Sequence, residues 1–283
     1  MDKSVVTWLW KGNRDYRPHH VNVLASMFRR HLSAHRFICI TDMDSGFDDG
    51  VEVMPMPEAA KDLGKFRTME GSWFPSCYRR LWMFSDEARC LGDRVLLVDI
   101  DMVLTGSVDH LFDSHADFVG WQPKAEWGGH DRIGGGIYLL RTGSHTEVYE
   151  DFEGLASIAQ ARMAGFRGSD QAWMSYKLFG KVELFPEDSG IYSVRDLGEG
   201  SSLPSDACLI QFNGKKKPWD YPKPKWVDSH WRENADSQDG RGRRGDRAPE
   251  KRGTRRTHPR YSKSTGKGCR IGAQDSQTKR ATH

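Results

Sequence analysis

The feature that most constrains the fold of this chain is a short apolar run that ends in two aspartates. Residues 95–98 read Val-Leu-Leu-Val, and Asp99 and Asp101 follow at once. An uninterrupted apolar run of this length is typical of a strand buried on both faces, as in a parallel sheet. Because side chains alternate along a strand, we expect the two carboxylates on the same side. The pattern predicts an α/β sheet with acidic groups at one edge.

Two neighbouring carboxylates repel each other unless they share a cation. Mg²⁺ and Mn²⁺ prefer oxygen ligands and commonly join carboxylates to phosphates. In open α/β sheets, ligands bind outside the carboxyl ends of the strands. Asp99 and Asp101 therefore predict a metal–diphosphate site. The alternative is a polar strand end with two solvated aspartates.

Hydrophobic periodicity predicts the remaining elements. Strands are expected at residues 5–10, 37–41, 51–54, 117–121, 137–141, 181–185 and 208–212, and helices at residues 18–32, 75–90, 149–163 and 170–178. Strands and helices alternate early in the chain, which favours parallel strands with covering helices, and the second half is mixed. We expect one domain over residues 1–232.

The charge of the chain is unevenly distributed. Residues 233–283 contain 14 Lys and Arg against 6 Asp and Glu, while the whole chain is +3, so residues 1–232 are mildly acidic. The basic segment has almost no large apolar residues and should form a disordered tail. Such a tail could contact nucleic acid or an anionic surface, or be a solvated appendage. Its single tyrosine, Tyr261, disfavours recognition of bases by stacking.

Several protein classes are disfavoured by composition. The five cysteines form no CxxC pair, and their odd number argues against a disulfide framework or a zinc knuckle. The start of the chain lacks signal-peptide architecture, and no apolar run approaches the length of a membrane span. We expect a cytoplasmic protein.

A second informative run follows the expected strand at residues 208–212. It reads Gln-Phe-Asn-Gly-Lys-Lys-Lys-Pro-Trp over residues 211–219. Glycine permits close approach of the backbone to a ligand, and lysine supplies compact positive charge for phosphate. The alternative is an exposed basic turn.

Together the two runs resemble the family-8 glycosyltransferases, which include glycogenin and bacterial galactosyltransferases. The family motif is His-x-x-Gly-x-x-Lys-Pro-Trp, and Gly214, Lys217, Pro218 and Trp219 match its spacing. The resemblance implies a GT-A-type nucleotide-diphospho-sugar transferase fold, a Rossmann-like mixed sheet flanked by helices in a single domain.

The resemblance also implies roles for these residues. Asp99 and Asp101 would bind Mn²⁺ or Mg²⁺, with Gln211 at the position of the family histidine. Gly214 and Lys217 would contact the donor diphosphate, and Asp99 would also belong to the donor-binding residues. A glutamine offers only a neutral amide oxygen, and Asn213 is a nearby substitute.

Two further segments resemble the family. Tyr-Arg-Arg-Leu at residues 78–81 resembles its Tyr-x-Arg-Leu helix and makes Arg80 a donor-binding residue; the alternative is a surface arginine. The run at residues 133–140 resembles its Asn-Ser-Gly-Val-Met-Leu segment, with Gly134 in place of the asparagine. Gly135 and Gly136 then allow close backbone approach to the donor.

Residues 168–173 resemble the Asp-Gln pair that begins a helix beside the reacting sugar carbon, which makes Asp170 and Gln171 the catalytic candidates. Asp170 could instead be a helix-start carboxylate.

At the ends of the first two expected strands, four residues could contact the nucleotide. Trp10, Lys11 and Tyr16 could cover the base, and Asp42 could meet the base or ribose. The aromatic residues could equally belong to the core. His19 and His20 lie at a helix start, where packing or solvent explains them better than metal.

We expect a metal-dependent, retaining glycosyltransferase of the hexosyltransferase type that uses a nucleotide-diphosphate sugar, expected to be UDP-linked. The acceptor is an unknown hydroxyl, and its pocket is expected from the loops at residues 120–132 and 195–205. A catalytically degenerate nucleotide-sugar-binding protein is the first alternative, because Gln211 and Gly134 replace family residues. A nucleotidyltransferase on a similar fold and a nucleic-acid-binding protein are the others.

Overall fold

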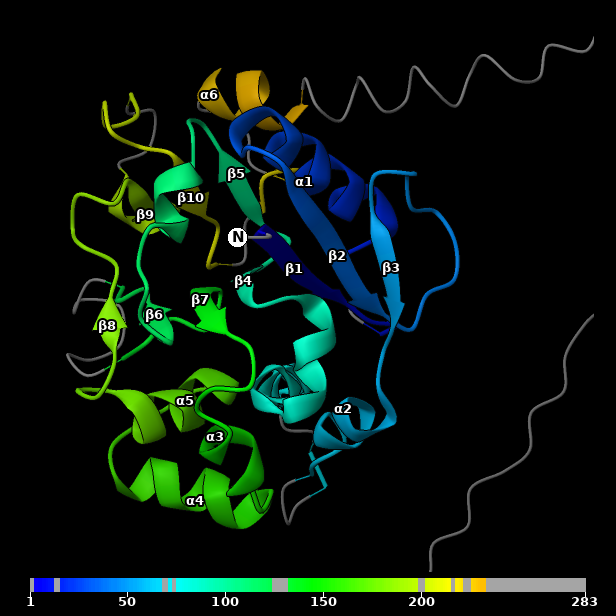
Figure 1. The fold of residues 1–283 in the computed structure, drawn as a ribbon, viewed down its shortest axis with the longest axis vertical. Coiled ribbons are helices and arrows are strands. Elements are labelled where there is room, and N and C mark those ends of the chain that lie inside the picture. The colour runs from blue at the N-terminus through cyan, green and yellow to red at the C-terminus, as the bar shows by residue number, and fades with distance from the viewer. Residues whose placement is uncertain are drawn as a thin grey trace, which may run out of the picture. The chain divides into compact units, whose positions relative to one another are not determined.

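A central mixed sheet organises the chain, whose computed structural model describes residues 3–12, 16–67, 71–72, 75–123, 132–197, 202–214, 217–220 and 225–232. Its seven strands have the order β3-β2-β1-β4-β7-β6-β8 (Figure 1). The expected tail at 233–283 lies outside the described residues, so its disorder and the domain boundary stay predictions.

The strands of this sheet are β1 (Lys3–Leu9), β2 (His35–Thr41), β3 (Glu52–Pro55), β4 (Arg94–Val98), β6 (Phe118–Gly120), β7 (Ile137–Arg141) and β8 (Glu183–Leu184). β1 pairs in parallel with β2 and β4, whereas β7 runs antiparallel to β4 and β6. A second sheet has the order β5-β10-β9, formed by Met102–Leu104, Leu209–Gln211 and Ile191–Ser193. The prediction of parallel strands followed by a mixed region is confirmed.

Helices cover both sheets. The α-helices are α1 (Pro18–His31), α2 (Glu58–Leu63), α3 (Glu147–Glu150), α4 (Leu155–Met163), α5 (Asp170–Leu178) and α6 (Lys225–Val227). Four short 3₁₀-helices, η1 (Ser76–Phe84), η2 (Asp86–Leu91), η3 (Asp109–Phe112) and η5 (Val194–Asp196), and the π-helical turn η6 (Asp228–Arg232) complete the described elements. In Figure 1, α3, α4 and α5 gather below the sheet.

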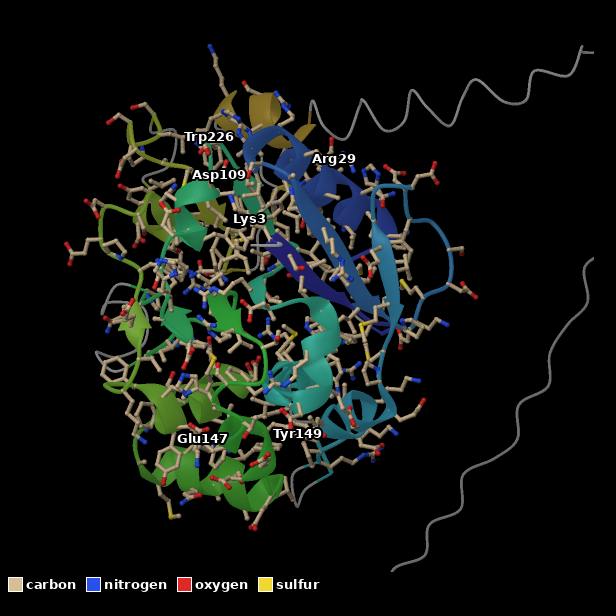
Figure 2. All side chains as sticks on the ribbon, in the orientation of Figure 1. Lys3, Arg29, Asp109, Glu147, Tyr149 and Trp226 are labelled. Carbon is tan, nitrogen blue, oxygen red and sulfur yellow. The ribbon has the colours of Figure 1, made fainter. Side chains whose placement is uncertain are left out.

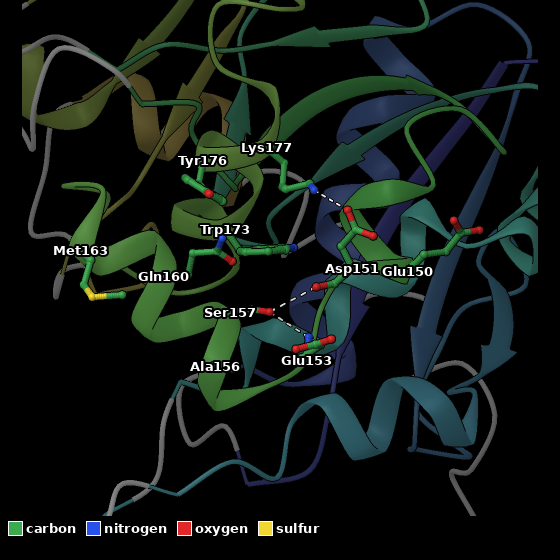
Figure 3. A pocket seen from close by; sticks show the side chains of 10 residues that line it. All are labelled: Glu150, Asp151, Glu153, Ala156, Ser157, Gln160, Met163, Trp173, Tyr176 and Lys177. Carbon is green, nitrogen blue, oxygen red and sulfur yellow. Dashed lines mark hydrogen bonds and ion pairs between the residues drawn. The ribbon is translucent and has the colours of Figure 1, made fainter.

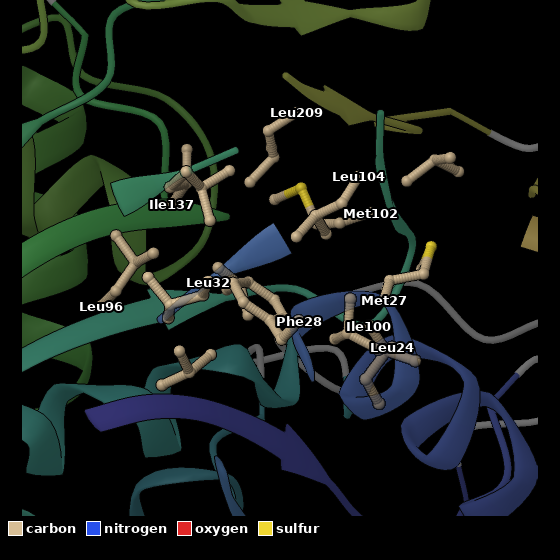
Figure 4. Close-up of a cluster of buried hydrophobic side chains, with 14 of the residues drawn as sticks. Leu24, Met27, Phe28, Leu32, Leu96, Ile100, Met102, Leu104, Ile137 and Leu209 are labelled. Carbon is tan, nitrogen blue, oxygen red and sulfur yellow. The ribbon is translucent and has the colours of Figure 1, made fainter. Parts of the chain in front are cut away.

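The central strand β4 is buried on both faces, as its apolar run predicts. Leu96 and Val98 belong to one hydrophobic cluster, and Val95 and Leu97 to another. The first cluster lies under α1, whose Leu24, Met27 and Phe28 pack toward β4 and β5 together with Leu32, which follows the helix (Figure 4). The second lies under η1. The alternation of strand side chains thus produces two cores, one on each side of the sheet.

Two predicted helices are wrong in detail. Residues 75–90 form η1 and η2, separated at Ser85, whose backbone is extended (ψ 158°). In η1 the buried Tyr78, Leu81 and Phe84 are three residues apart, which matches the three residues per turn of a 3₁₀-helix. The helix predicted at 149–163 is broken between α3 and α4, where Gly154 adopts φ 65°.

Strand lengths also differ from the prediction. β8 has only two residues, both exposed, although five were predicted, and β5 and β9 were not predicted at all. Three-residue strands are too short for a periodic signal. No described helix has the length and apolar character needed to cross a membrane. Cys39, Cys77, Cys90 and Cys208 are free thiols.

Candidate functional site

Asp99 and Asp101 lie where the two sheets meet. The backbone N–H of Asp99 donates to the carbonyl of Gly136 at 2.8 Å, next to the last residue pair of the β4–β7 ladder. The carbonyl of Asp101 accepts a hydrogen bond from the backbone N–H of Phe212 at 3.0 Å, beside the β5–β10 ladder. Gln211 lies opposite Met102 in the β5–β10 ladder. The strand registers therefore bring the predicted metal ligands, which are far apart in the sequence, to one place.

Arg80 of η1 joins two of the site carboxylates. Its Nε and Nη2 donate to the two oxygens of Asp170 at 2.8 and 3.0 Å, and its Nη1 donates to Asp99. Burial alone would lower the pKa of Arg80, but Asp170 and Asp99 outweigh it and raise that pKa. The arginine is thus fully engaged in the interior and is not the surface residue that the alternative interpretation proposed.

Asp101 has its own cationic partner. Lys217 Nζ lies 2.5 Å from Asp101 Oδ2 and donates to the carbonyl of Phe212 at 3.3 Å. The Tyr16 hydroxyl donates to the same carboxylate oxygen at 2.9 Å. The lysine and tyrosine that the sequence placed at the donor site therefore meet at Asp101.

The run that contains Lys217 is anchored by aromatic packing. Trp219 stacks on His20, with ring centroids 3.8 Å apart and planes 6° from parallel. His20 Nδ1 accepts a hydrogen bond from Arg17 N–H at 3.2 Å, and burial lowers the pKa of His20 to about 4. A neutral imidazole in this position explains His20 by packing, as expected.

The carboxyl group of Asp99 has a perturbed pKa. Burial raises its pKa to about 6, and the charges of Asp101 and Asp170 act in the same direction, while Arg80 opposes them. Three carboxylates therefore share two cationic side chains. The excess negative charge makes this a place where an added cation is favourable.

The donor set fits a hard divalent cation. Among the described residues, no group of three or more His, Cys, Asp or Glu side chains could hold a metal. Gln211 Nε2 lies 3.5 Å from Asp99 Oδ2, so a rotation of its amide would present the oxygen there. Two carboxylates and an amide oxygen leave coordination positions for phosphate and water, a shell that Mg²⁺ and Mn²⁺ accept.

The predicted glycines are needed because the backbone of residues 134–136 passes close to site side chains. A Cβ at Gly136 would collide with Gln211 and lie 2.7 Å from Asp99 Oδ2. A Cβ at Gly135 would lie 3.0 Å from the Cβ of Gln171. Gly135 N–H donates to Gln171 Oε1 at 3.4 Å, which ties the run to α5.

An aromatic cavity of about 220 Å³ opens on one side of Asp99. It is lined by Trp8, Trp10, Tyr16, Cys77, Arg80, Asp99 and Ile100. Trp10 is also covered by the guanidinium of Arg79, 4.7 Å from the ring centroid. Of the four predicted nucleotide contacts, Trp10 and Tyr16 line this cavity.

The other two predicted contacts lie elsewhere. Lys11 N–H donates to Asp42 Oδ1 at 2.8 Å, which joins the ends of β1 and β2. Neither residue lines the aromatic cavity. Burial lowers the pKa of Arg79, and the negative charge of Asp42 opposes that shift.

A polar cavity of about 210 Å³ opens near Gln211 and α5. It is lined by Trp121, Pro123, Arg132, Gly134, Gly135, Gln171, Arg195, Gln211 and Asn213. Its edges come from both loops that were expected to form the acceptor pocket, although residues 124–131 and 198–201 lie outside the described part of the chain. Gly214 lies beside Arg195, whose guanidinium would be 3.7 Å from a Cβ at that glycine.

A wider cavity of about 640 Å³ lies between α3, α4 and α5 (Figure 3). Lys177 pairs there with Asp151 at 2.5 Å, and Ser157 Oγ accepts from Glu153 N–H at 2.8 Å. None of the predicted site residues lines it.

Sequence reasoning missed Trp8 of the aromatic cavity, Arg79, which covers Trp10, and two arginines of the polar cavity. Arg79 is adjacent to Arg80, so the doubled arginine was a usable signal. Trp8 faces the same side of β1 as Trp10, which alternation could have revealed. Arg132 and Arg195 had no signal beyond their place in variable loops.

The similarity of this chain to known proteins lies in its fold. No family model and no curated protein matches the sequence. The fold is similar to that of the galactosyltransferase LgtC, solved with donor and acceptor sugar analogues: the TM-score is 0.57 and identity 13%, over 84% of this chain and 99% of LgtC. An active-site mutant of LgtC gives a TM-score of 0.56 at 13% identity, over 83% and 95%.

A glycosyltransferase from Streptococcus pneumoniae TIGR4, GlyE in its apo form, is also similar, with a TM-score of 0.52 and 11% identity. The match covers 86% of this chain but only 64% of GlyE. The mixed α/β sheet flanked by helices is the GT-A glycosyltransferase fold, as predicted.

Proposed function

We propose that this protein transfers a sugar from a nucleotide-diphosphate donor, expected to be a UDP-sugar, to a hydroxyl acceptor. One observation supports this most. Asp99, Asp101, Arg80 and Lys217 converge at the carboxyl end of β4, between an aromatic cavity and a polar one. That arrangement suits a ligand with a flat base, a diphosphate and a sugar in sequence. The GT-A fold is consistent with it.

The diphosphate is proposed to lie against Lys217 and the backbone of Gly214. Lys217 is pre-positioned by Asp101 and the carbonyl of Phe212, so its ammonium need not be ordered when the donor binds. A fixed positive charge stabilises the leaving diphosphate more as its negative charge grows. Arg80 is proposed to assist from the other side of Asp99.

The base is proposed to occupy the aromatic cavity, against Trp10 and Tyr16. Stacking on a flat ring suits any base, so it does not by itself select uracil. The preference for UDP therefore rests on the resemblance of the sequence to family-8 enzymes.

Asp99, Asp101 and Gln211 are the residues proposed to bind Mn²⁺ or Mg²⁺. When bound, the cation would neutralise charge on the leaving diphosphate. This proposal is supported by the raised pKa of Asp99, because an added cation would favour its ionised form.

In the proposed reaction, the acceptor oxygen forms a bond to the anomeric carbon as the bond from that carbon to the diphosphate breaks. The leaving diphosphate keeps the electron pair and takes up the hydroxyl proton. Gln171, which lines the polar cavity, is proposed to lie beside the sugar. Asp170 is occupied by Arg80 and Ser169, so we assign it the positioning of Arg80. Retention of anomeric configuration is expected from the resemblance.

Isothermal calorimetry of the full chain with UDP and with GDP, each with and without Mn²⁺, tests this proposal. We expect Mn²⁺-dependent binding of UDP and much weaker binding of GDP. Binding that is indifferent to Mn²⁺ would remove the metal from the proposal. No binding of either nucleotide would contradict the proposed donor class.

A catalytically degenerate nucleotide-sugar-binding protein is the second candidate. It is favoured by Gln211, which stands at the position of the family histidine and offers a neutral amide beside Asp99. Release of free sugar from UDP-glucose and UDP-galactose separates the two candidates. Binding of these donors without any hydrolysis or transfer would favour the degenerate protein.

A further inference from the structure

The helical turn η6 contacts one end of the run that contains Lys217. Its Trp231 is buried, and the ring centroid lies 5.8 Å from that of Trp219. Trp231 also lies 6.2 Å from His20 of α1, the ring on which Trp219 stacks. Because η6 itself lies against α1 and β5, aromatic rings from two elements of the core hold Trp219.

The preceding helix, α6, contacts the other end of the same run. The ring centroid of its Trp226 lies 5.9 Å from that of Phe212. The backbone of Phe212 belongs to the site, because its N–H donates to the carbonyl of Asp101 at 3.0 Å and its carbonyl accepts from Lys217 Nζ at 3.3 Å. The tryptophans of α6 and η6 therefore contact both ends of the segment at residues 212–219, of which residues 215–216 lie outside the described part.

Tyr16 connects this aromatic packing to the charged groups of the site. Its ring lies edge-on to Trp219, with centroids 5.5 Å apart, and Lys217 Nζ lies 5.5 Å from its centroid. Its hydroxyl donates to Asp101. A displacement of Trp219 would thus act on the tyrosine and the lysine that meet at Asp101.

The residues proposed to meet the diphosphate, Gly214 and Lys217, lie in no helix or strand. Backbone that regular secondary structure does not fix is ordered either before the ligand binds or at a cost to affinity. Neither Trp226 nor Trp231 lines the aromatic or the polar cavity. An effect of these tryptophans on the donor would therefore pass through the segment at residues 212–219.

We propose that Trp226 and Trp231 are positioning residues, which order the segment at residues 212–219 so that Gly214 and Lys217 face the donor diphosphate before it binds. The inference rests on the proposed function and adds α6 and η6 to the elements that build its site. Ordering in advance raises affinity for the diphosphate and leaves binding of the base unchanged.

Hydrogen exchange of the full chain without ligand measures the order of this segment. The N–H of Phe212 is bonded to Asp101, so a peptide that covers residues 212–220 should be protected in the wild type. Trp226→Ala and Trp231→Ala should each accelerate exchange in this peptide about tenfold. Peptides from β1 and β4 should keep the wild-type rate, which separates a local effect from a general loss of stability.

Calorimetry with Mn²⁺ measures the consequence for the donor. UDP should bind about tenfold more weakly to both alanine variants. Uridine, which lacks the diphosphate, should bind the variants as it binds the wild type. Trp231→Phe keeps a ring beside Trp219 and should restore most of the affinity for UDP.

Two choices keep these measurements interpretable. Tyr149→Ala, at a partly buried aromatic residue of α3, is the matched control and should change neither exchange at residues 212–220 nor affinity for UDP. Trp226 is only partly buried, so Trp226→Ala carries the test if Trp231→Ala does not fold.

Three results would overturn the inference. One is unchanged exchange at residues 212–220 in both alanine variants. Another is faster exchange with unchanged affinity for UDP. The third is an equal weakening of uridine and UDP, since the effect would then not concern the diphosphate. In each of these the proposed function stands. If the wild-type chain binds no UDP, the proposed donor is wrong, and exchange alone decides whether the tryptophans order the segment.

Discussion

The two edges of the central sheet use the same kinds of residues in opposite environments. At the amino edge, Lys3 of β1 pairs with Asp109 of η3 at 2.5 Å, with side chains 23% and 42% exposed; both are labelled in Figure 2. At the carboxyl edge, Arg80 pairs with Asp170 at 2.8 Å, with side chains only 9% and 7% exposed. Water screens the first pair, whereas the protein interior must satisfy the second.

This difference changes what the charges can do. The Lys3 ammonium and the Ser33 hydroxyl hold the pKa of Asp109 well below its usual range, so that carboxylate stays ionised. Burial instead raises the pKa of Asp99 to about 6. The exposed pair fastens η3 to β1, whereas the buried cluster holds charge in an environment that a phosphate or cation would stabilise.

The largest expected effect is on stability at the carboxyl edge. Arg80→Gln leaves Asp99 and Asp170 without their shared cation, and we expect a loss of about 3–5 kcal/mol in the free energy of unfolding. Urea unfolding at pH 7 measures it. Arg89→Gln, which removes a 62%-exposed arginine, should cost less than about 1 kcal/mol. Equal losses in both variants would abolish the contrast between the edges.

Asp101→Asn should affect binding and turnover more than folding. The substitution retains hydrogen bonds to Tyr16 but removes the charge that holds Lys217 and would bind the cation. We expect a decrease in donor turnover of about a hundred- to a thousandfold. Asp113→Asn, at an exposed position, is the control. Wild-type turnover in the Asp101 variant would exclude the metal–diphosphate site.

Stability should depend on His20 in acid. Its pKa is lowered to about 4 in the folded state and is 6.5 when unperturbed, so the unfolded chain binds the proton more readily. Stability is therefore full above 6.5 and falls as the pH decreases toward 4, by at most about 3 kcal/mol. His20→Phe keeps a ring against Trp219 and should flatten this slope, whereas His115→Gln should not.

The His20 effect has to be measured as a difference between variants. The raised pKa of Asp99 has the opposite sign, because the folded state then binds the proton more readily and stability increases as the pH falls from 6 to 4. Subtraction of the His20→Phe curve from the wild-type curve removes this contribution. An unchanged slope in His20→Phe would show that the stacked histidine does not titrate as inferred.

Binding of UDP-glucose with Mn²⁺ should depend on the ionisation of Asp99. Since its pKa is about 6 in the free protein, we expect affinity to decrease roughly tenfold per pH unit below 6 and to level off above it. UDP-glucose is the suitable probe because, unlike UDP, it has no terminal phosphate that titrates near pH 6. A flat profile between pH 5 and 7 would remove Asp99 from the binding site.

The smallest effect is expected at the amino edge. Lys3→Gln removes a partly exposed ion pair and should lower the free energy of unfolding by less than about 1 kcal/mol. The loss should shrink further in 1 M salt, because exposed charges are screened. A loss above about 2 kcal/mol would mean that the two edges are energetically alike.

The sequence by itself determined the buried strand β4, the acidic pair at its end and the order of the early strands and helices. These features are local: a run of apolar residues fixes burial, and alternation fixes the two faces. The predicted site residues Asp99, Asp101, Arg80, Gln211 and Lys217 also meet, because the strand registers bring their segments to one edge. Their roles in catalysis stay predictions.

Tertiary structure decided the rest. In the folded chain, Asp170 accepts a hydrogen bond from Arg80. Residues 75–90, predicted as one helix, form two 3₁₀ segments. Lys11 and Asp42 bind each other and do not line the aromatic cavity. It also brought Arg132 and Arg195 to one wall. Ion pairing and burial depend on which segments approach in space. No local pattern in the sequence encodes that distance, whereas a strand's burial is encoded in its own residues.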